Sequence, residues 1–236
     1  MNWFLLVSAA SIGFVHTLIG PDHYLPFIMM GRAQAWSRTR TLWVTFLCGL
    51  GHVLSSVLLG IVGVVFGVAL HRLELIESVR GDIAAWALIA FGLIYGAWGL
   101  RRALRGRASC HAHVHTHDDG TVHTHGHIHA DAAAHNHAHT PRAVMTTWTL
   151  FTVFVLGPCE PLIPLLMYPA ASESIAGMVA VATVFSLVTI ATMMAMVWAI
   201  SAGVARVPLG AMERFTHAIS GAVIAMAGIS IQLLGL

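Results

Sequence analysis

Two short, similar stretches decide the fold of this chain: GPDHYLPF at residues 20–27 and GPCEPLIPL at residues 157–165. Each begins with Gly-Pro, continues with acidic, histidine or cysteine side chains, and contains a further proline within an otherwise apolar segment. A proline inside a helix removes a backbone hydrogen bond, so both helices should break here. Within a membrane, backbone N–H and C=O groups without helical hydrogen bonds are tolerated only where they are buried in protein or line a water-filled cavity. We therefore expect both stretches to face an internal site.

The composition is that of an integral membrane protein. Of the 236 residues, 57% are hydrophobic and 9% are charged, and the mean hydropathy is +0.79. A soluble domain has about a quarter of its residues charged. Six apolar segments are long enough to cross a hydrocarbon core that needs about 20 helical residues. They are residues 3–30, 41–70, 83–100, 144–170, 175–205 and 215–236.

The arginines predict the orientation in the membrane. The chain has no lysine, and all but two of its twelve basic residues follow the first, third or fifth span. The exceptions, Arg72 and Arg80, fall in an acidic loop that also holds Glu74, Glu77 and Asp82. By the positive-inside rule the arginine-rich side is cytoplasmic, which predicts a multi-pass protein of the plasma (inner) membrane with both termini outside. The net charge of +2 reflects this bias and gives no argument for nucleic acid.

The second half of the chain repeats the order of the first. Gly20 and Gly157 lie 137 residues apart, and Gly92 and Gly228 near the two ends lie 136 apart. Because three spans is an odd number, the second copy should be inverted relative to the first. The predicted fold is an all-α polytopic membrane protein of six transmembrane helices, arranged as two inverted three-helix repeats with broken first helices. The repeats are residues 1–100 and 144–236, and a histidine-rich cytoplasmic loop at 101–143 joins them.

Several side chains that can ionise or bind metal lie within the apolar spans. A charge at the bilayer centre costs about 2.5 to 3.5 kcal/mol, so a functional role is expected. Imidazole and carboxylate ligands suit a first-row divalent ion such as nickel, cobalt or zinc better than calcium or magnesium. Cys159 is left open between an inert buried residue, a soft ligand and a redox thiol. The predicted metal site consists of His16, Asp22, His23, His52, Cys159 and Glu160.

The histidine-rich loop binds metal by its composition, although no spacing in it defines one closed site. We interpret it as a cytoplasmic metal buffer that raises the local ion concentration, and the alternative is a dispensable biased segment. The histidines form three alternating runs, namely His111, His113, His115 and His117, then His123, His125, His127 and His129, then His135, His137 and His139.

These residues resemble the nickel/cobalt transporter superfamily, in particular its compact six-span nickel/cobalt efflux and urease-accessory-like membrane proteins. Members have a histidine followed by Asp-His in the first span, matched here by His16, Asp22 and His23, and a histidine-rich loop at mid-chain. The second half begins with Gly157-Pro158-Cys159, as members often have Gly-x-x-Pro-Cys. The gap between His16 and Asp22-His23 is five residues here instead of the usual four, so the identity of the ion is left open.

The sequence therefore predicts a transporter whose substrate is a divalent transition-metal ion, with no organic cofactor and no enzymatic reaction. The expected partners are membrane lipid and the ion itself, and a homo-oligomer is left open. A cytoplasmic histidine reservoir favours export over import. One alternative is an exporter of sulfite or another small anion held by half-helix N-termini, although Asp22 and Glu160 would repel it. The other is a thiol-disulfide carrier that uses Cys159, with Cys48 as the only other cysteine in a span.

Overall fold

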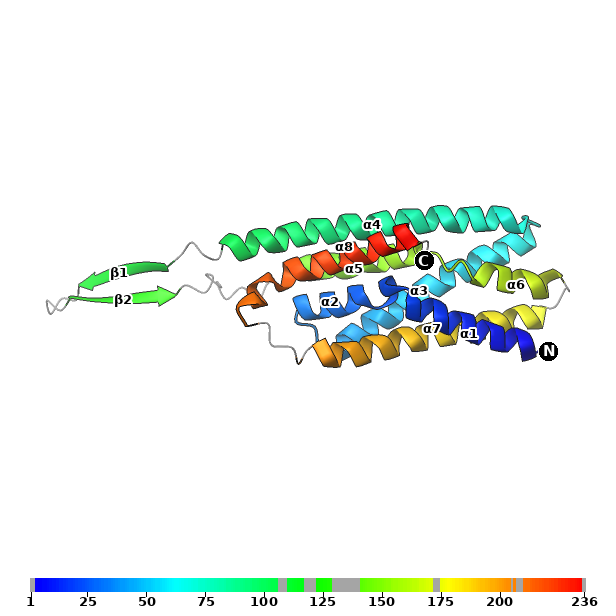
Figure 1. Ribbon diagram of the computed structural model, residues 1–236, viewed down its shortest axis with the longest axis horizontal. Coiled ribbons are helices and arrows are strands. Elements are labelled where there is room, and N and C mark those ends of the chain that lie inside the picture. Colours follow the sequence, from blue (N-terminus) through cyan, green and yellow to red (C-terminus); the bar gives the residue numbers. More distant parts are fainter. Residues whose placement is uncertain are drawn as a thin grey trace.

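The computed structural model describes residues 3–105, 110–116, 122–128, 141–171, 175–204, 206 and 210–234. The described residues form a bundle of helices from which a two-stranded ribbon projects at one end (Figure 1). The helical body agrees with the expected all-α class, because the two strands are confined to the histidine-rich segment.

The first helix is broken at the first Gly-Pro stretch, as expected. Helix α1 (Trp3–Ile19) leads into a single 3-10 turn, η1 (Pro21–His23), and then into α2 (Leu25–Ala33). The two arms meet at an angle of 83°. Gly20 is extended there and Pro21 has no N–H to continue the α-helical pattern, so the chain changes direction. Two long helices follow, α3 (Arg38–Val65) and α4 (Leu70–Arg105).

The second half has a similar order of helices. Helix α5 (Pro141–Leu156) ends at the second Gly-Pro stretch, and after an irregular segment α6 (Leu162–Ala171) begins. Helix α7 (Ile175–Val204) follows, then the 3-10 segment η2 (Gly210–Phe215) and α8 (Thr216–Leu234). Figure 1 shows that α1 and α2 run in the opposite direction to α5 and α6. The two broken helix pairs therefore pass through the bundle in opposite directions (Figure 1).

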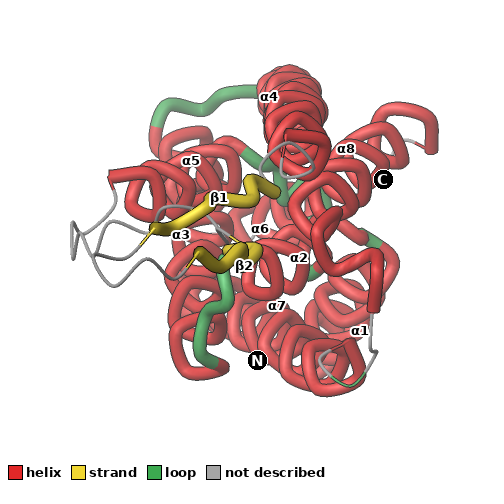
Figure 2. The backbone as a smooth tube through the Cα atoms, turned by 90° about the vertical axis from the view of Figure 1, so that its left-hand side faces the viewer, coloured by secondary structure: helices red, strands yellow, loops and turns green. Residues whose placement is uncertain are grey.

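Small residues bring the last helices of the two halves into close contact. A Cβ added to Gly92 of α4 would lie 2.7 Å from the carbonyl oxygen of Gly221 on α8, and one added to Gly228 would lie 2.9 Å from that of Ala85. Gly92 and Gly228, which stand 136 residues apart in the chain, thus lie in one shared contact between α4 and α8. In the end-on view α2 lies near the middle of the bundle, with α7, α3 and α8 around it (Figure 2).

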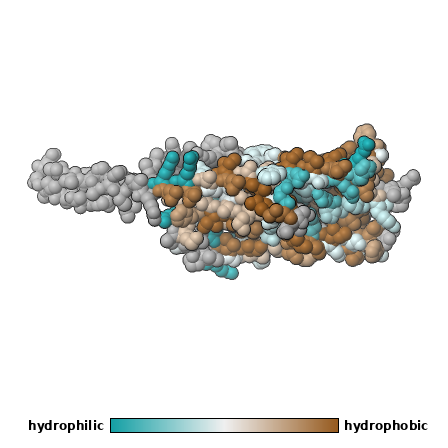
Figure 3. Space-filling model, turned by 45° about the horizontal axis from the view of Figure 1, so that its top comes forward, coloured by the Kyte–Doolittle hydropathy of each residue, from teal (hydrophilic) through white to brown (hydrophobic). Residues whose placement is uncertain are grey.

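The apolar surface is consistent with a membrane protein. Helices α3, α4, α7 and the segment Met212–Leu233 are long and apolar enough to cross a membrane, and the bent pair of α1 and α2 makes a fifth span if it is counted as one. Among the described residues the α5–α6 pair does not qualify, so the six expected spans are not confirmed. Hydrophobic colour covers much of the helical body in Figure 3, with hydrophilic patches toward its two ends.

The histidine-rich segment contains an antiparallel ribbon. Strand β1 (Cys110–Thr116) pairs with β2 (Val122–Ile128) so that His111, His113 and His115 have His127, His125 and His123 as their Cα partners. The remaining loop histidines lie outside the described residues; they are His117, His129, His135, His137 and His139.

Helix α4 contains the apolar segment 83–100 and extends beyond it at both ends, from Leu70 to Arg105, so residues expected in the flanking loops are helical. Glu77 is fully buried, whereas Arg72 and Glu74 are exposed on the same helix. The charged residues lower the hydropathy of the first turns of α4, so hydropathy alone does not indicate a helix there. Glu77 pairs with Arg80 one turn along, and this ion pair offsets the cost of burying the carboxylate.

Candidate metal site between the two broken helices

Residues of both helix breaks line one cavity together with residues of α1, α3, α4 and α8. It is called the main cavity below because the histidines of the apolar spans lie in it. Its volume is about 470 Å³. The lining includes Asp22 and His23 from η1 and His52 from α3. The second break contributes Gly157, Pro158, Glu160 and Pro161. Both Gly-Pro stretches therefore face one internal space, as the proline pattern predicts.

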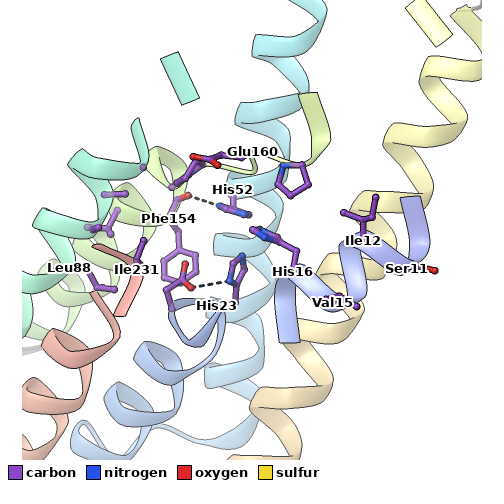
Figure 4. A pocket seen from close by; sticks show the side chains of 18 residues that line it. Ser11, Ile12, Val15, His16, His23, His52, Leu88, Phe154, Glu160 and Ile231 are labelled. Carbon is purple, nitrogen blue, oxygen red and sulfur yellow. Dashed lines mark hydrogen bonds and ion pairs between the residues drawn. The ribbon is translucent and has the colours of Figure 1, made fainter. Parts of the chain in front are cut away.

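Three histidines gather at this cavity. The ring centroids of His16 and His23 lie 4.8 Å apart, and those of His23 and His52 lie 5.2 Å apart, with the rings nearly perpendicular in both pairs. Figure 4 shows the three imidazoles turned toward one another, while Ser11, also in the lining, lies to one side. The break after α1 makes this possible, because it sets His23 beside His16 instead of two full helical turns away.

Hydrogen bonds determine which nitrogen of two of these rings carries the proton. His52 Nδ1 lies 3.3 Å from the carbonyl oxygen of Phe154, which only accepts, so Nδ1 is the donor. His23 Nδ1 lies 3.3 Å from the Gly20 carbonyl oxygen and 3.2 Å from Asp22 Oδ1, which are also acceptors. A neutral ring protonated at Nδ1 leaves a lone pair at Nε2 for a metal ion. This arrangement, with a carbonyl or carboxylate behind each imidazole, is common around bound metals.

The inward-facing nitrogens lack partners. The Nε2 atoms of His16, His23 and His52 are all buried and have no hydrogen-bond partner among the described residues. Leaving one buried polar atom unpaired costs about 1 to 3 kcal/mol, so three together are expensive. A cation bound among them would relieve this cost. The three unpaired nitrogens are the strongest local sign of a binding site.

Cys159 adds a sulfur donor to this group. It is fully buried, and its Sγ lies with one ring nitrogen each of His16 and His52 so that all three atoms are within 4.8 Å of one another. Metal–nitrogen and metal–sulfur bonds of about 2.0 and 2.3 Å at tetrahedral angles place such donors about 3.5 Å apart. The donors must therefore approach by about an ångström for all three to bind one ion.

The two acidic residues take different places from the histidines. Asp22 bonds to His23, and its side chain is 25% exposed, so it orients an imidazole from the cavity wall. Glu160 is exposed and lines the edge of the cavity, and in Figure 4 it lies apart from the three rings. Of the six predicted site residues, the structure thus brings together His16, His23, His52 and Cys159, with Asp22 behind His23.

A second polar network, which the sequence analysis did not include, supports this site. Arg80 Nη1 donates to Glu77 Oε1 at 2.7 Å, and its Nη2 donates to Ser55 Oγ at 2.8 Å and to the Val155 carbonyl oxygen at 2.9 Å. Val155 lies at the end of α5, where the break leaves carbonyls without helical partners. Arg80 and His52 therefore take adjacent carbonyls of α5, those of Val155 and Phe154. The i, i+3 spacing of Glu77 and Arg80 was the available sequence signal.

Comparison of the chain with protein-family models, with curated proteins and with solved structures finds no match. The functional argument therefore depends on the geometry of the site.

Proposed function

We propose that the chain is a membrane transporter whose substrate is a divalent transition-metal ion, bound by His16, His23, His52 and Cys159 between the two broken helices. The observation that carries this proposal is the group of three buried, unpartnered Nε2 atoms, together with the buried thiol of Cys159 near ring nitrogens of His16 and His52. Nitrogen and sulfur donors select nickel, cobalt or zinc over magnesium and calcium, which prefer oxygen. No chemical reaction is part of the proposal.

The position of the site supports transport over simple storage. Two interrupted helices from inverted halves that meet at one cavity are the arrangement in which secondary transporters bind their substrates. The arginine-rich ends of α2, α3 and α4 lie at the end that bears the histidine-rich ribbon (Figure 1). By the positive-inside rule this end is cytoplasmic, so the ribbon would collect ions inside the cell and export is the favoured direction.

The anion alternative has less support from the lining. No arginine is among the described residues that line the main cavity, whereas Asp22 and Glu160 are. A small anion would meet two carboxylates there and no positive side chain except a protonated histidine. The thiol-carrier alternative requires a partner for Cys159, but Cys48 packs in a different hydrophobic cluster.

The test is metal transport by the full chain in liposomes, with nickel, cobalt and zinc supplied separately. We expect His52→Ala to abolish ion-selective transport and Cys159→Ser to weaken it, because each removes a donor to the ion. His71→Ala is the matched control, since His71 is exposed at the start of α4 and is not among the residues that line the main cavity. Deletion of residues 109–140 should preserve transport at saturating ion and lower it at limiting ion.

Cobalt(II) provides an independent readout of binding. A thiolate-to-cobalt charge-transfer band should be present in the wild-type protein and in His71→Ala, and absent in Cys159→Ser. Transport that is equal in His52→Ala and His71→Ala would refute the site. Disulfide exchange by Cys159, with no cation moved by any variant, would favour the thiol carrier instead.

A further inference from the structure

A smaller, separate cavity lies at the arginine-rich end of the bundle, where α2, α3 and α7 meet. Its volume is about 120 Å³, roughly the liquid volume of four water molecules. Arg32 of α2 and Arg38 of α3 line it, and no acidic side chain is among its described lining residues. The lining is therefore positive, unlike that of the main cavity.

Two hydrogen-bond donors in this lining have no partner. They are the indole Nε1 of Trp36 and the hydroxyl of Ser201, both buried at the atom and unpaired among the described residues. The contrast within α7 is informative, because Ser186 and Thr192 each donate to the carbonyl four residues earlier. An indole N–H can only donate, so the missing partner of Trp36 must be an acceptor.

The arginine side chains are held close to these two donors. Arg32 Nη1 donates to the carbonyl oxygen of Val204, which ties α2 to the end of α7. The guanidinium of Arg40 lies 4.9 Å from the centre of the Trp36 ring and fixes one face of the indole. Guanidinium groups recognise the oxygens of phosphate through directed hydrogen bonds. A phosphate group also offers several oxygens to donors that approach from three different helices.

The surroundings of the cavity indicate a lipid as the source of that phosphate. Trp198, which lines the cavity, is 61% exposed, and Trp43 on α3 is 60% exposed. Exposed tryptophans next to arginines at helix ends mark the boundary between hydrocarbon and headgroups. The rest of the lining includes Leu42 and Val197, so apolar surface continues from the cavity along α3 and α7.

We propose that this cavity binds the phosphate group of an anionic phospholipid from the leaflet at the arginine-rich end. The phosphate lies between Arg32 and Arg38 and accepts hydrogen bonds from Trp36 and Ser201, while the acyl chains follow α3 and α7. The lipid joins α2, the arm of the broken helix beyond His23, to two neighbouring helices. This proposal is independent of which ion is transported and requires only that the helices span a membrane.

The test is thermal unfolding of the purified full chain in a neutral detergent, with added phosphatidylglycerol, phosphatidylcholine or inorganic phosphate. Phosphatidylglycerol should raise the unfolding midpoint, and phosphatidylcholine should not. Trp36→Phe keeps the ring but removes the N–H, and Ser201→Ala removes the hydroxyl. Each should weaken phosphatidylglycerol binding by about tenfold or more, the usual effect of losing a hydrogen bond to a charged group. Native mass spectrometry of retained lipid gives a second readout.

Arg38→Gln and Arg101→Gln form a matched pair, because each removes one exposed arginine from the same end of the molecule. Arg38→Gln should lose most of the stabilisation, and Arg101→Gln should keep it. An equal loss in both variants, or no loss in Trp36→Phe and Ser201→Ala, would overturn the proposal in favour of diffuse surface charge. A shift of the same size with inorganic phosphate, to which phosphatidylglycerol adds nothing, would overturn the lipid assignment.

Discussion

The Glu77–Arg80 pair provides the sharpest test of how the second helix break is held. Glu77 has no exposed side-chain surface and Arg80 has 18%, so the two partners are not equivalent. Replacing Arg80 with glutamine leaves the buried carboxylate without its cation and frees the Val155 carbonyl. Breaking a buried pair in this way costs about 3 to 5 kcal/mol of unfolding free energy.

Replacing the other partner, Glu77, should lower the free energy of unfolding by a smaller amount. Glu77→Gln keeps an oxygen acceptor for Arg80, and the partly exposed guanidinium retains some contact with solvent, so we expect about 1 to 2 kcal/mol. In the double variant neither charge remains, and the two amides can bond to each other. The double variant should therefore be less destabilised than the sum of the single variants, by about 1 to 3 kcal/mol.

The assay is reversible unfolding in mixed micelles with a denaturing detergent, with the free energy obtained by linear extrapolation. Arg72→Gln and Glu74→Gln are the controls, because both side chains are exposed on the same helix. Exposed substitutions of this kind should stay within about 0.5 kcal/mol of the wild type. Equal effects of Arg80→Gln and Glu77→Gln, or strict additivity in the double variant, would refute the reasoning.

Two further predictions concern packing and the support of the site. Gly92→Ala should lower stability by about 1 to 3 kcal/mol, since its Cβ would lie 2.7 Å from a backbone oxygen of α8. Gly203→Ala, with no described atom within 4 Å of the new Cβ, should be neutral or slightly stabilising when both are compared by thermal unfolding. Asp22→Ala should weaken metal binding about 10- to 100-fold because His23 loses the carboxylate behind it, while Asp22→Asn, which still offers an oxygen, should lose less. Competitive metal titration measures this, and equal affinities for Asp22→Ala and wild type would contradict the role given to Asp22.

Much of the helix order was predictable because prolines and apolar segments act locally. The break at Pro21 and the end of α5 before Pro158 both appear where a missing N–H requires them. The start of α4 was not predictable from hydropathy. Its first turns carry exposed charges together with the buried Glu77. The partner of that carboxylate, Arg80, is held by tertiary contacts with α3 and α5, which hydropathy does not record.

The sequence predicted which residues form the candidate site better than it predicted the role of each residue. His16, His23 and His52 were identified because polar side chains in a membrane are costly. Which nitrogen of His52 faces the cavity depends on a carbonyl from another helix, that of Phe154, which lies 102 residues away in the chain. The separate positions of Asp22 and Glu160 likewise depend on how the two breaks face each other.

The sequence by itself determined that the chain is an apolar helical protein, where its helices break, and which side chains in it can bind a cation. These properties follow from composition and from the missing backbone hydrogen bonds of proline, which need no tertiary contact. Only the tertiary structure decided that the breaks meet at one cavity, that Cys159 joins the histidines and that Arg80 holds the end of α5. Each of these depends on contacts between residues far apart in the chain, which no local pattern records.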